Sequence, residues 1–413
     1  MKYLILVGDG MADFPIPELG GQTPLEAAFT PSLDDIAANG ISGQFWPIPD
    51  GFAAGSDIGN LSLFGYSPRQ TFTGRAPLEA ASQGITLAPG QIAFRCNLVT
   101  LQNGTMEDFT SGHISTEEAR SIIDSLSAAL TNFSVRFSPG VSYRHLTILT
   151  PPSDMMEDLT RLTCVPPHDI TGQPFAPHLP TGPGAQMILD LMQASIPVLA
   201  EHPVNQARVA AGKLPATSIW LWGQGCAPSM VSYKERFNLK GAVISAVDLV
   251  KGLGVCAGLD VINVPGATGY LDTNYKGKVA AAVEALRRKD FVYLHVEAPD
   301  EASHEGKLNL KIKAIEDFDA RVVGPCLERV LAMGNCRVLV APDHVTALST
   351  KTHAGGPVPF AMCGAGIEPD ATDHFSERAA EASGLCVTDG ALVAEHFLTA
   401  PRITTASLNR LGK

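Results

Sequence analysis

The stretch GKVAAAVEALRRKDFVYLHVEAPD, residues 277–300, contains the pattern that decides the fold of this chain. Its first half predicts a helix, and the uninterrupted apolar run FVYLHV at 291–296 predicts a buried strand. Similar apolar runs lie at 3–7, 218–222 (SIWLW), 260–264 (DVINV) and 337–341 (RVLVA), and a second helical pattern runs from 310 to 333. Apolar strands that alternate with helices predict an α/β fold, in which helices cover both faces of a mainly parallel sheet.

The middle of the chain has a different composition. From about residue 71 to residue 215 it is richer in Pro, Gly, Ser and Thr, and the proline-rich stretches TPPSD (150–154) and VPPHDITGQPFAPHLPTGPG (165–184) interrupt the periodicity. The alternation of strands and helices resumes at Ser218. We therefore expect residues 71–215 to form a second domain, inserted into a core made of residues 1–70 and 216–413.

Bulk properties exclude some classes of function. A formal net charge of −12 argues against a general nucleic-acid binder or a protein that binds anionic membranes. The eight cysteines form no CxxC pair, which is typical of free thiols in a reducing compartment. The N-terminal apolar run at 3–7 is too short for a signal peptide or a membrane span. We expect a cytoplasmic protein, and the sequence leaves its oligomeric state open.

Four short motifs place Asp and His residues at predicted strand ends or in the loops beyond them. LVGDGM carries Asp9, LHVEAPDEASHEGK carries Asp300 and His304, VAPDHVT carries Asp343 and His344, and KTHAGGPVPF carries His353. Taken singly, each motif could be a turn or a charged loop. Together they supply three carboxylates and three imidazoles at the edge where α/β sheets bind their ligands.

This set of side chains favours a metal-dependent reaction. Mixed nitrogen and oxygen ligands suit Mn²⁺ or Zn²⁺ better than Mg²⁺ or Ca²⁺. Six protein ligands are too many for one catalytic ion with an open position, and they suit two ions. Two metal ions a few ångströms apart act on the attacking and leaving oxygens of a phosphoryl transfer.

The stretch GFAAGSDIGNLSLFGY, residues 51–66, places Ser56 before a predicted short helix. Serine is a favoured N-cap residue, so a purely structural role is open. A divalent cation and the positive end of a helix dipole would both stabilise its alkoxide, so a nucleophilic role is compatible with the same position. We expect Gly55 to allow close approach of the backbone, and Asp57 and Asn60 to support the site.

The order of these motifs resembles the cofactor-independent phosphoglycerate mutases, specifically the archaeal-type branch of the alkaline phosphatase superfamily. The resemblance runs nearly end to end, and it includes LGGQTPLEAAFTPSLDDIAANG, TGRAPLEAAS, FRCNLVTL, HISTEEA, EHPVNQAR and GATGYLDTN. It implies an alkaline phosphatase-like core with an inserted α+β lid domain. It also implies that 3-phosphoglycerate and 2-phosphoglycerate are interconverted without 2,3-bisphosphoglycerate, through a transient phosphoserine at Ser56.

The same resemblance implies a set of ligands and substrate-binding residues. Two divalent metal ions are implied, with Mn or Zn favoured and Mg or Co possible. One ion would be bound by Asp300, His304 and His353, and the second by Asp9, Ser56, Asp343 and His344. Arginine suits the recognition of carboxylate and phosphate. The residues expected to bind the small phosphorylated substrate are Arg75, Arg95, His113, Arg144, Asn205 and Arg208.

One departure from the family keeps alternatives open. His113 stands where the archaeal mutases tend to carry arginine, and a bacterial branch resembling this chain has been proposed to be a homoserine kinase. The alternative function is therefore a metal-dependent phosphotransferase that acts on homoserine. The chain has no GxxxxGK[ST] loop to bind a nucleotide donor. A simple two-metal phosphatase and a catalytically inactive metal-binding protein are further alternatives.

Overall fold

The computed structural model describes residues 1–411 and divides the chain into two compact units. The first unit combines Met1–Phe72 with the chain from Ser229 onward, and the second is the continuous segment Thr73–Pro228. The prediction that residues 216–228 belong to the core is wrong. The apolar run at 218–222 forms part of β7 (Ser218–Gly225), which pairs with β3 (Ile92–Gln102) inside the second unit.

The first unit is built on an eight-stranded sheet with the order β15-β2-β14-β11-β1-β10-β8-β9. Its central strands β11, β1, β10 and β8 run parallel, whereas β14 is antiparallel to both of its neighbours. The strands are β1 (Lys2–Gly8), β2 (Gly40–Phe45), β8 (Gly241–Ile244), β9 (Asp260–Val261), β10 (Phe291–Val296), β11 (Cys336–Ala341), β14 (Val358–Gly364) and β15 (Cys386–Val387). The predicted mainly parallel α/β fold is confirmed, although the strand expected at 260–264 is shorter.

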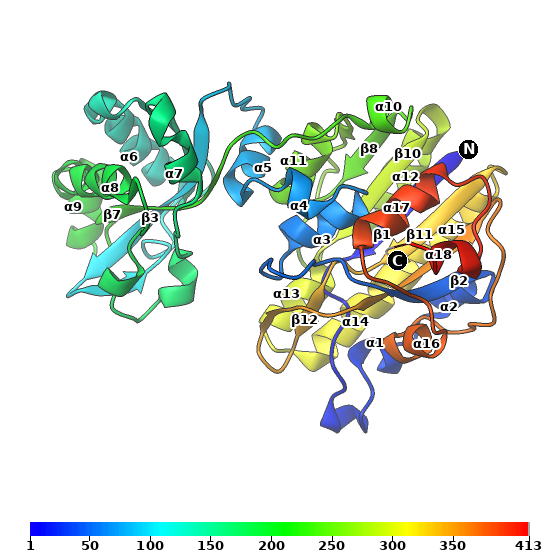
Figure 1. Cartoon of the computed structure of the whole chain (residues 1–413). Helices are drawn as coiled ribbons and strands as arrows, with labels where there is room; N and C mark the ends of the chain where they lie inside the picture. Colours follow the sequence, from blue (N-terminus) through cyan, green and yellow to red (C-terminus); the bar gives the residue numbers. More distant parts are fainter. Residues whose placement is uncertain (412–413) are drawn as a thin grey trace. The chain divides into compact units, whose positions relative to one another are not determined.

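Helices cover both faces of this sheet (Figure 1). Alternate residues of β1 point to opposite faces. Leu4 and Leu6 belong to the large buried cluster formed with α2, α12, α14 and α15, whereas the Tyr3 ring packs edge-on against Phe397 of α17. The helices are α2 (Pro31–Ala38), α12 (Tyr275–Arg288), α14 (Leu308–Phe318) and α15 (Gly324–Leu331) on one face, and α3 (Ser56–Leu63), α11 (Asp248–Cys256) and α17 (Gly390–Thr399) on the other. Burial of each large apolar side chain stabilises the unit by about 1.5–3 kcal/mol.

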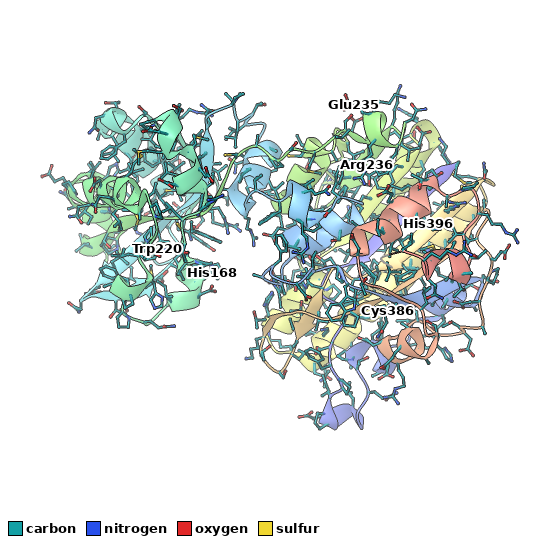
Figure 2. The ribbon with its side chains drawn as sticks, viewed as in Figure 1. His168, Trp220, Glu235, Arg236, Cys386 and His396 are labelled. Atoms are coloured by element: carbon teal, nitrogen blue, oxygen red, sulfur yellow. The ribbon has the colours of Figure 1, made fainter. Side chains whose placement is uncertain are left out.

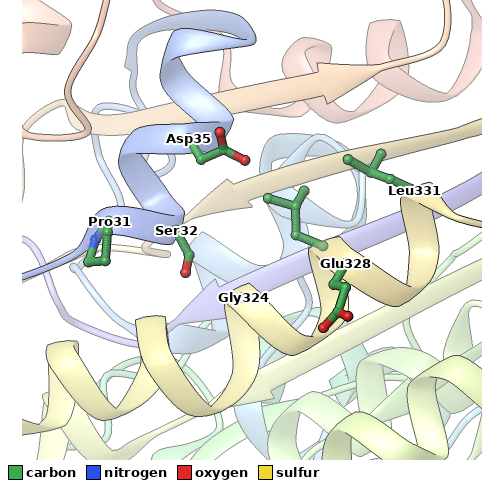
Figure 3. Close-up of a pocket in the computed structure, with 7 residues that line it drawn as sticks. Pro31, Ser32, Asp35, Gly324, Glu328 and Leu331 are labelled. Atoms are coloured by element: carbon green, nitrogen blue, oxygen red, sulfur yellow. The ribbon is translucent and has the colours of Figure 1, made fainter.

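The helical pattern predicted at 310–333 contains a π-helical turn, η6 (Asp319–Val323), between α14 and α15. This turn directs the carboxylate of Asp319 to the start of α2, where it accepts hydrogen bonds from the backbone N–H groups of Ser32 and Leu33 at 3.3 and 2.7 Å. A carboxylate at a helix N-terminus satisfies free N–H donors and complements the helix dipole. A shallow pocket between α2 and α15 is lined by Pro31, Ser32, Asp35, Gly324, Leu327, Glu328 and Leu331 (Figure 3).

Shorter elements complete the first unit. They are η1 (Pro17–Leu19), α1 (Pro24–Ala27), α4 (Pro68–Thr71), α10 (Tyr233–Arg236), α13 (Ala298–His304), β12 (Val345–Ala347), β13 (Thr352–Ala354), α16 (Glu377–Ala382) and α18 (Thr405–Leu408). The strands β12 and β13 form a separate two-stranded antiparallel sheet. Within residues 1–411, no helix is both long and apolar enough to cross a membrane.

The second unit has its own antiparallel sheet and its own core. Strand β3 lies between β6 and β7, and the sheet consists of β3, β4 (Thr105–Asp108), β5 (Val135–Ser138), β6 (Arg144–Leu149) and β7. Its helices and turns are α5 (Arg75–Ser82), α6 (Thr116–Ala129), α7 (Met156–Thr160), α8 (Ala185–Ala200), α9 (Pro203–Ala210), η2 (Thr131–Phe133), η3 (Ser153–Met155), η4 (Pro167–Ile170) and η5 (Ala176–His178). The buried side chain of Trp220 lies in this unit (Figure 2), and its indole N–H donates a hydrogen bond to the Val165 carbonyl at 2.8 Å.

Candidate metal centre

The candidate site lies at the carboxyl edge of the main sheet, where three neighbouring parallel strands end. Strand β1 lies between β10 and β11, and its residue Val7 is in register with His295 of β10 and Ala341 of β11. The acidic motifs directly follow these strands, so Asp9 and the motifs after β10 and β11 meet at one edge. This arrangement follows from parallel pairing, which brings the ends of like-directed strands together.

The first group of donors comprises Asp300, His304 and His353. Asp300 and His304 lie one turn apart on α13, and the Nε2 atom of His304 is 3.1 Å from Oδ2 of Asp300. His353 comes from β13, and its Nε2 atom is 3.4 Å from Oδ1 of Asp300 and 3.1 Å from Nε2 of His304. Two imidazole nitrogens and a carboxylate that converge in this way form a suitable set of ligands for one divalent ion.

The second group surrounds the buried side chain of Asp9. The Nε2 atom of His344 lies 3.4 Å from Oδ1 of Asp9 and 3.4 Å from Oδ2 of Asp343. All three side chains are almost fully buried. The hydroxyl Oγ of Ser56 lies 3.0 Å from the same Nε2 atom of His344. The structure therefore brings together all seven residues that the sequence analysis assigned to the metal sites.

Ser56 is the first residue of α3, and it is not the N-cap. Gly55 occupies the cap position with extended backbone, and no side chain caps the helix there. The capping role that we considered for Ser56 is therefore wrong, because its hydroxyl is directed to His344 instead. Its position at the start of the helix still places it near the positive end of the helix dipole.

Asn60 holds the serine and the second donor group in place from one turn further along α3. Its side-chain amide donates hydrogen bonds to the Ser56 carbonyl at 2.8 Å and to Oδ2 of Asp343 at 2.5 Å. The hydroxyl of Tyr293 on β10 donates to the amide oxygen of Asn60 at 2.6 Å. The expectation that Asn60 supports the site fits these contacts, whereas the Asp57 carboxylate accepts a hydrogen bond from the neighbouring Ile58 N–H.

Two residues of the site were not found from the sequence. His295 lies within the apolar strand β10, and its Nε2 atom is 2.9 Å from Oδ2 of Asp9, so it belongs to a third candidate group with Asp9 and Asp343. A histidine in an otherwise apolar strand was the available signal. Thr346 is fully buried beside Asp300 and His344. A threonine after the Asp-His pair carried no recognisable signal.

The buried carboxylates have opposite electrostatic environments. Burial, followed by the charges of Asp343 and Asp300, raises the pKa of Asp9 well above its ordinary value. Burial would also raise the pKa of Asp300, but hydrogen bonds with His304 and His353 hold it well below its ordinary value. Among the described residues, Oδ1 of Asp9 is a buried oxygen with no hydrogen-bond donor. A crowded set of carboxylates with an unsatisfied oxygen fits a bound cation.

The histidines respond to the same surroundings. The hydrogen bond with Asp300 raises the pKa of His304 to about 9. Burial lowers the pKa of His295 to about 4, and burial also lowers the pKa of His344. A neutral imidazole is the form that ligates a metal, so His295 and His344 are held in that form by desolvation.

Three of the predicted substrate-binding arginines gather in the second unit. The guanidinium of Arg95 lies 4.1 Å from the centre of the Trp222 ring, and its Nε is 3.0 Å from the Glu79 carboxylate. The Nε of Arg75 is 3.2 Å from the same carboxylate. Burial lowers the pKa of Arg95 to about 10; Glu79 opposes this shift, and Arg75 and Arg144 add to it. Arg75 and Arg95 share the Glu79 carboxylate, and Arg144 lies near enough to act on Arg95, so the three cations form a candidate anion site.

The other three predicted substrate residues lie in different settings. His113 is an exposed loop residue with a positive φ of 50°. Asn205 is buried, and its amide bonds the backbone of Leu199 and Ala216. Both amide N–H donors are used within the fold, which favours a structural role for Asn205 over the predicted substrate role.

Arg208 also has a structural position. Its buried guanidinium donates to the carbonyl groups of Leu214 and Ser111 at 2.9 and 2.6 Å, and it pairs with the Glu118 carboxylate at 2.9 Å. These contacts favour a structural role for Arg208 over the predicted substrate role. The sequence could not distinguish a buried arginine that bonds backbone carbonyls from an arginine that binds a ligand, since both are single arginines in a polar segment.

Comparisons with known proteins agree with one another. A family model described as 2,3-bisphosphoglycerate-independent phosphoglycerate mutase matches residues 37–205. A curated Geobacter sulfurreducens protein, named as a probable enzyme of this kind, is 52% identical over 403 residues, which cover 96% of this chain and 100% of that protein. A Methanosarcina acetivorans protein of the same name is 53% identical over 381 residues, covering 92% of this chain and 94% of that protein.

Solved structures agree with this similarity. A protein from Pyrococcus horikoshii matches with a TM-score of 0.82 at 32% identity, covering 100% of this chain and 98% of that chain. The cofactor-independent phosphoglycerate mutase from Thermoplasma acidophilum matches with a TM-score of 0.66 at 29% identity, covering 97% of this chain and 100% of that chain.

Proposed function

This chain belongs to the family of 2,3-bisphosphoglycerate-independent phosphoglycerate mutases, and we propose that it interconverts 3-phosphoglycerate and 2-phosphoglycerate through a phosphoserine at Ser56. The observation that carries this proposal is the position of the Ser56 hydroxyl, 3.0 Å from Nε2 of His344, beside the carboxylates of the second donor group. We assign the nucleophilic role to Ser56; its contact with Nε2 of His344 and its position at the start of α3 support this assignment.

Two divalent ions, manganese or zinc in the first instance, would complete the site. One is assigned to Asp300, His304 and His353, and the other to Asp9, Ser56, Asp343 and His344, which are in contact through Nε2 of His344. When bound, such ions lower the pKa of a coordinated hydroxyl and neutralise charge that develops on the transferring phosphoryl group. The donor groups and the unsatisfied oxygen of Asp9 support this assignment.

The chain's own residues perform the transfer in two balanced steps. In the first, Ser56 Oγ loses its proton and forms a bond to phosphorus, while the bond between phosphorus and the 3-oxygen of the substrate breaks and that oxygen gains a proton. In the second, the 2-hydroxyl of the retained glycerate loses its proton and forms a bond to phosphorus, while the bond between phosphorus and Ser56 Oγ breaks and Oγ regains a proton. The side-chain amide of Asn60 orients Ser56 during both steps by a hydrogen bond to the Ser56 backbone carbonyl.

The second unit supplies groups suited to the anionic substrate. Arg75, Arg95 and Arg144 are assigned to the carboxylate and phosphate, since a guanidinium can bond both in bidentate geometry. Local cations of this kind offset the net negative charge of the chain.

Other functions gain less support. The curated relatives reported above are named as phosphoglycerate mutases, and these names give the homoserine kinase alternative no support. The eight cysteines, all within the described residues, are unpaired. Free thiols are typical of a reducing compartment, which supports the cytoplasm as the proposed location.

The experiment that tests the proposal supplies the manganese-loaded protein with 3-phosphoglycerate in the absence of 2,3-bisphosphoglycerate. Phosphorus NMR should detect 2-phosphoglycerate. The Ser56→Ala variant should lose this conversion and keep its fold. The control is Ser62→Ala in the same helix, where the wild-type hydroxyl donates to the Pro47 carbonyl; this variant should still convert the substrate. Turnover by Ser56→Ala would refute the phosphoserine mechanism. Phosphohomoserine formed from homoserine and ATP, with no mutase activity, would favour the alternative function.

A further inference from the structure

Thr346 lies between the two groups of candidate metal ligands. It is fully buried in β12, and its backbone is in register with His353 on β13. Its hydroxyl Oγ1 donates a hydrogen bond to Oδ1 of Asp300 at 2.6 Å and lies 3.1 Å from Nδ1 of His344. One side chain thus contacts a ligand from the first group and a ligand from the second.

The hydroxyl has only one proton, and this limits how the three groups can bond. The ionised carboxylate of Asp300 accepts hydrogen bonds and cannot donate one, so it takes the proton of Thr346. Oγ1 then has only lone pairs to offer Nδ1 of His344. The contact at 3.1 Å is a hydrogen bond only if Nδ1 of His344 carries the ring proton.

From this contact we propose that Thr346 is a positioning residue, which fixes the tautomer of His344 so that Nε2 presents its lone pair to the position assigned to the second ion, beside Ser56. This inference rests on the proposed metal-dependent function. The Nε2 atom is the one that faces Ser56 Oγ at 3.0 Å and Asp9 at 3.4 Å. The opposite tautomer would place a proton in the position assigned to the ion.

The first donor group contains a similar arrangement. The Nδ1 atom of His304 lies 2.9 Å from the backbone carbonyl of Lys351, which can only accept a hydrogen bond. The carbonyl therefore keeps a proton on Nδ1 of His304 in both the neutral and the charged ring, and Nε2 faces Asp300 and His353. Partners of this kind orient metal-ligating histidines and set their tautomer. Thr346 does for His344 what a backbone carbonyl does for His304.

The surroundings of Thr346 leave its hydroxyl little freedom. Its backbone N–H donates to the Ala12 carbonyl at 3.2 Å, and its carbonyl accepts from the buried Lys311 ammonium at 2.7 Å. Gly10, at φ 58°, packs so closely that a Cβ there would lie 2.4 Å from Oγ1 of Thr346. A β-branched side chain is already restricted at χ1, and these contacts restrict it further.

The test compares Thr346→Val, which removes the hydroxyl at nearly constant volume, with Thr346→Ser, which retains it. Calorimetric titration with Zn²⁺ should show two ions bound by the wild-type protein. Thr346→Val should bind the second ion about 10 to 100-fold more weakly, as is typical when a supporting partner of a ligand is lost. Thr346→Ser should restore most of that affinity.

A spectroscopic measurement tests the tautomer directly. In the metal-free protein labelled with ¹⁵N-histidine, long-range ¹H–¹⁵N spectra should show the proton of His344 on Nδ1 in the wild type, and a loss of this preference in Thr346→Val. Thr147→Val, which removes an equally buried threonine hydroxyl in the second unit, is the matched control and should change neither measurement.

The outcomes separate the two proposals. A proton on Nε2 of His344 in the wild type, or equal loss of zinc affinity in the Ser and Val variants, would overturn the role of Thr346. Failure of the wild-type protein to bind zinc would instead overturn the proposed function, and the tautomer measurement would still decide the role of Thr346.

Discussion

Helix α3 lies directly on the backbone of the loop that carries the Asp-His pair, because Gly59 leaves no side chain between them. A Cβ at Gly59 would lie 2.0 Å from the carbonyl oxygen of Asp343. The close approach that we expected at Gly55 occurs at Gly59, whereas a Cβ at Gly55 would lie 3.0 Å from the Asp57 side chain. The contact places Ser56 and Asn60 on the same side as Asp343.

Gly59→Ala should therefore displace the loop or the helix, since a backbone oxygen cannot move aside as a flexible side chain can. We expect it to lower stability by about 1–3 kcal/mol, which is typical of overpacking, and to abolish binding of the second metal ion. Denaturant unfolding and zinc titration would measure the two effects. Gly254→Ala is the control, because its Cβ would instead meet the Val243 side chain. Loss of stability without loss of metal binding in Gly59→Ala would contradict the interpretation.

Tyr293 fixes the orientation of the Asn60 amide, because its hydroxyl donates to Oδ1 of Asn60 at 2.6 Å. With the oxygen occupied, the amide nitrogen faces Asp343 and the Ser56 carbonyl. Tyr293→Phe should lower kcat by about 5 to 10-fold, since one hydrogen bond contributes about 1 kcal/mol. Asn60→Leu should lower kcat further. Steady-state kinetics would check the order, and equal kcat values in the wild type and Asn60→Leu would exclude this role.

Arg144 and Arg208 should respond differently to substitution. Arg144 is exposed and lies near Arg95 in the second unit. Arg144→Gln should therefore raise KM for phosphoglycerate about 10-fold with little change in Tm. Arg208→Met should lower the unfolding midpoint, because each buried carbonyl left without a donor costs about 1–3 kcal/mol. Kinetics and thermal unfolding on both variants would separate the roles. A raised KM with unchanged Tm in Arg208→Met would restore the sequence-based assignment.

The buried carboxyl of Glu377 should make the stability of the folded protein depend on pH. It accepts hydrogen bonds from Thr23 Oγ1 at 2.7 Å and from the Asp13 N–H at 3.0 Å. Burial, opposed by these hydrogen bonds, raises the pKa of Glu377 from 4.5 to about 7. Between these two values the folded state binds more protons than the unfolded state. The protonated Glu377 carboxyl therefore makes its full contribution to the free energy of unfolding below pH 4.5, and this contribution is lost as the pH rises through about 7.

Glu377→Gln keeps the side chain neutral, so its Tm relative to the wild type should be higher at pH 8 than at pH 5. Calorimetric scans at the two pH values would measure this difference. Glu381→Gln changes an exposed residue of the same helix and should show no such trend. A pH-independent difference for Glu377→Gln would show that the carboxyl does not titrate in this window.

The sequence was most informative where the signal is local. Each of the apolar runs at 3–7, 291–296 and 337–341 lies within a buried strand of the parallel sheet, because an unbroken apolar segment must be covered on both faces. The acidic motifs after these strands then had to meet, since parallel neighbours end at the same edge. The metal-ligand candidates and Ser56 could therefore be found without coordinates.

Two interpretations depended on partners that are distant in sequence. The apolar run at 218–222 reads as a core strand, yet it pairs with β3 in the second unit. Arg208 reads as a ligand-binding arginine, yet its donors are taken by Glu118 and by backbone carbonyls. The apolarity or charge of a residue can be read from the sequence, whereas a strand pairing or a hydrogen bond depends on two residues that only the fold brings together.

The sequence by itself determined the α/β alternation and the residue types that could hold metal ions. Only the tertiary structure decided that Gly59 carries the close approach, that His295 joins Asp9, and that Thr346 lies between Asp300 and His344. The reason is physical: a side chain can donate each proton only once, and which acceptor receives it depends on atoms brought within about 3 Å by the whole fold.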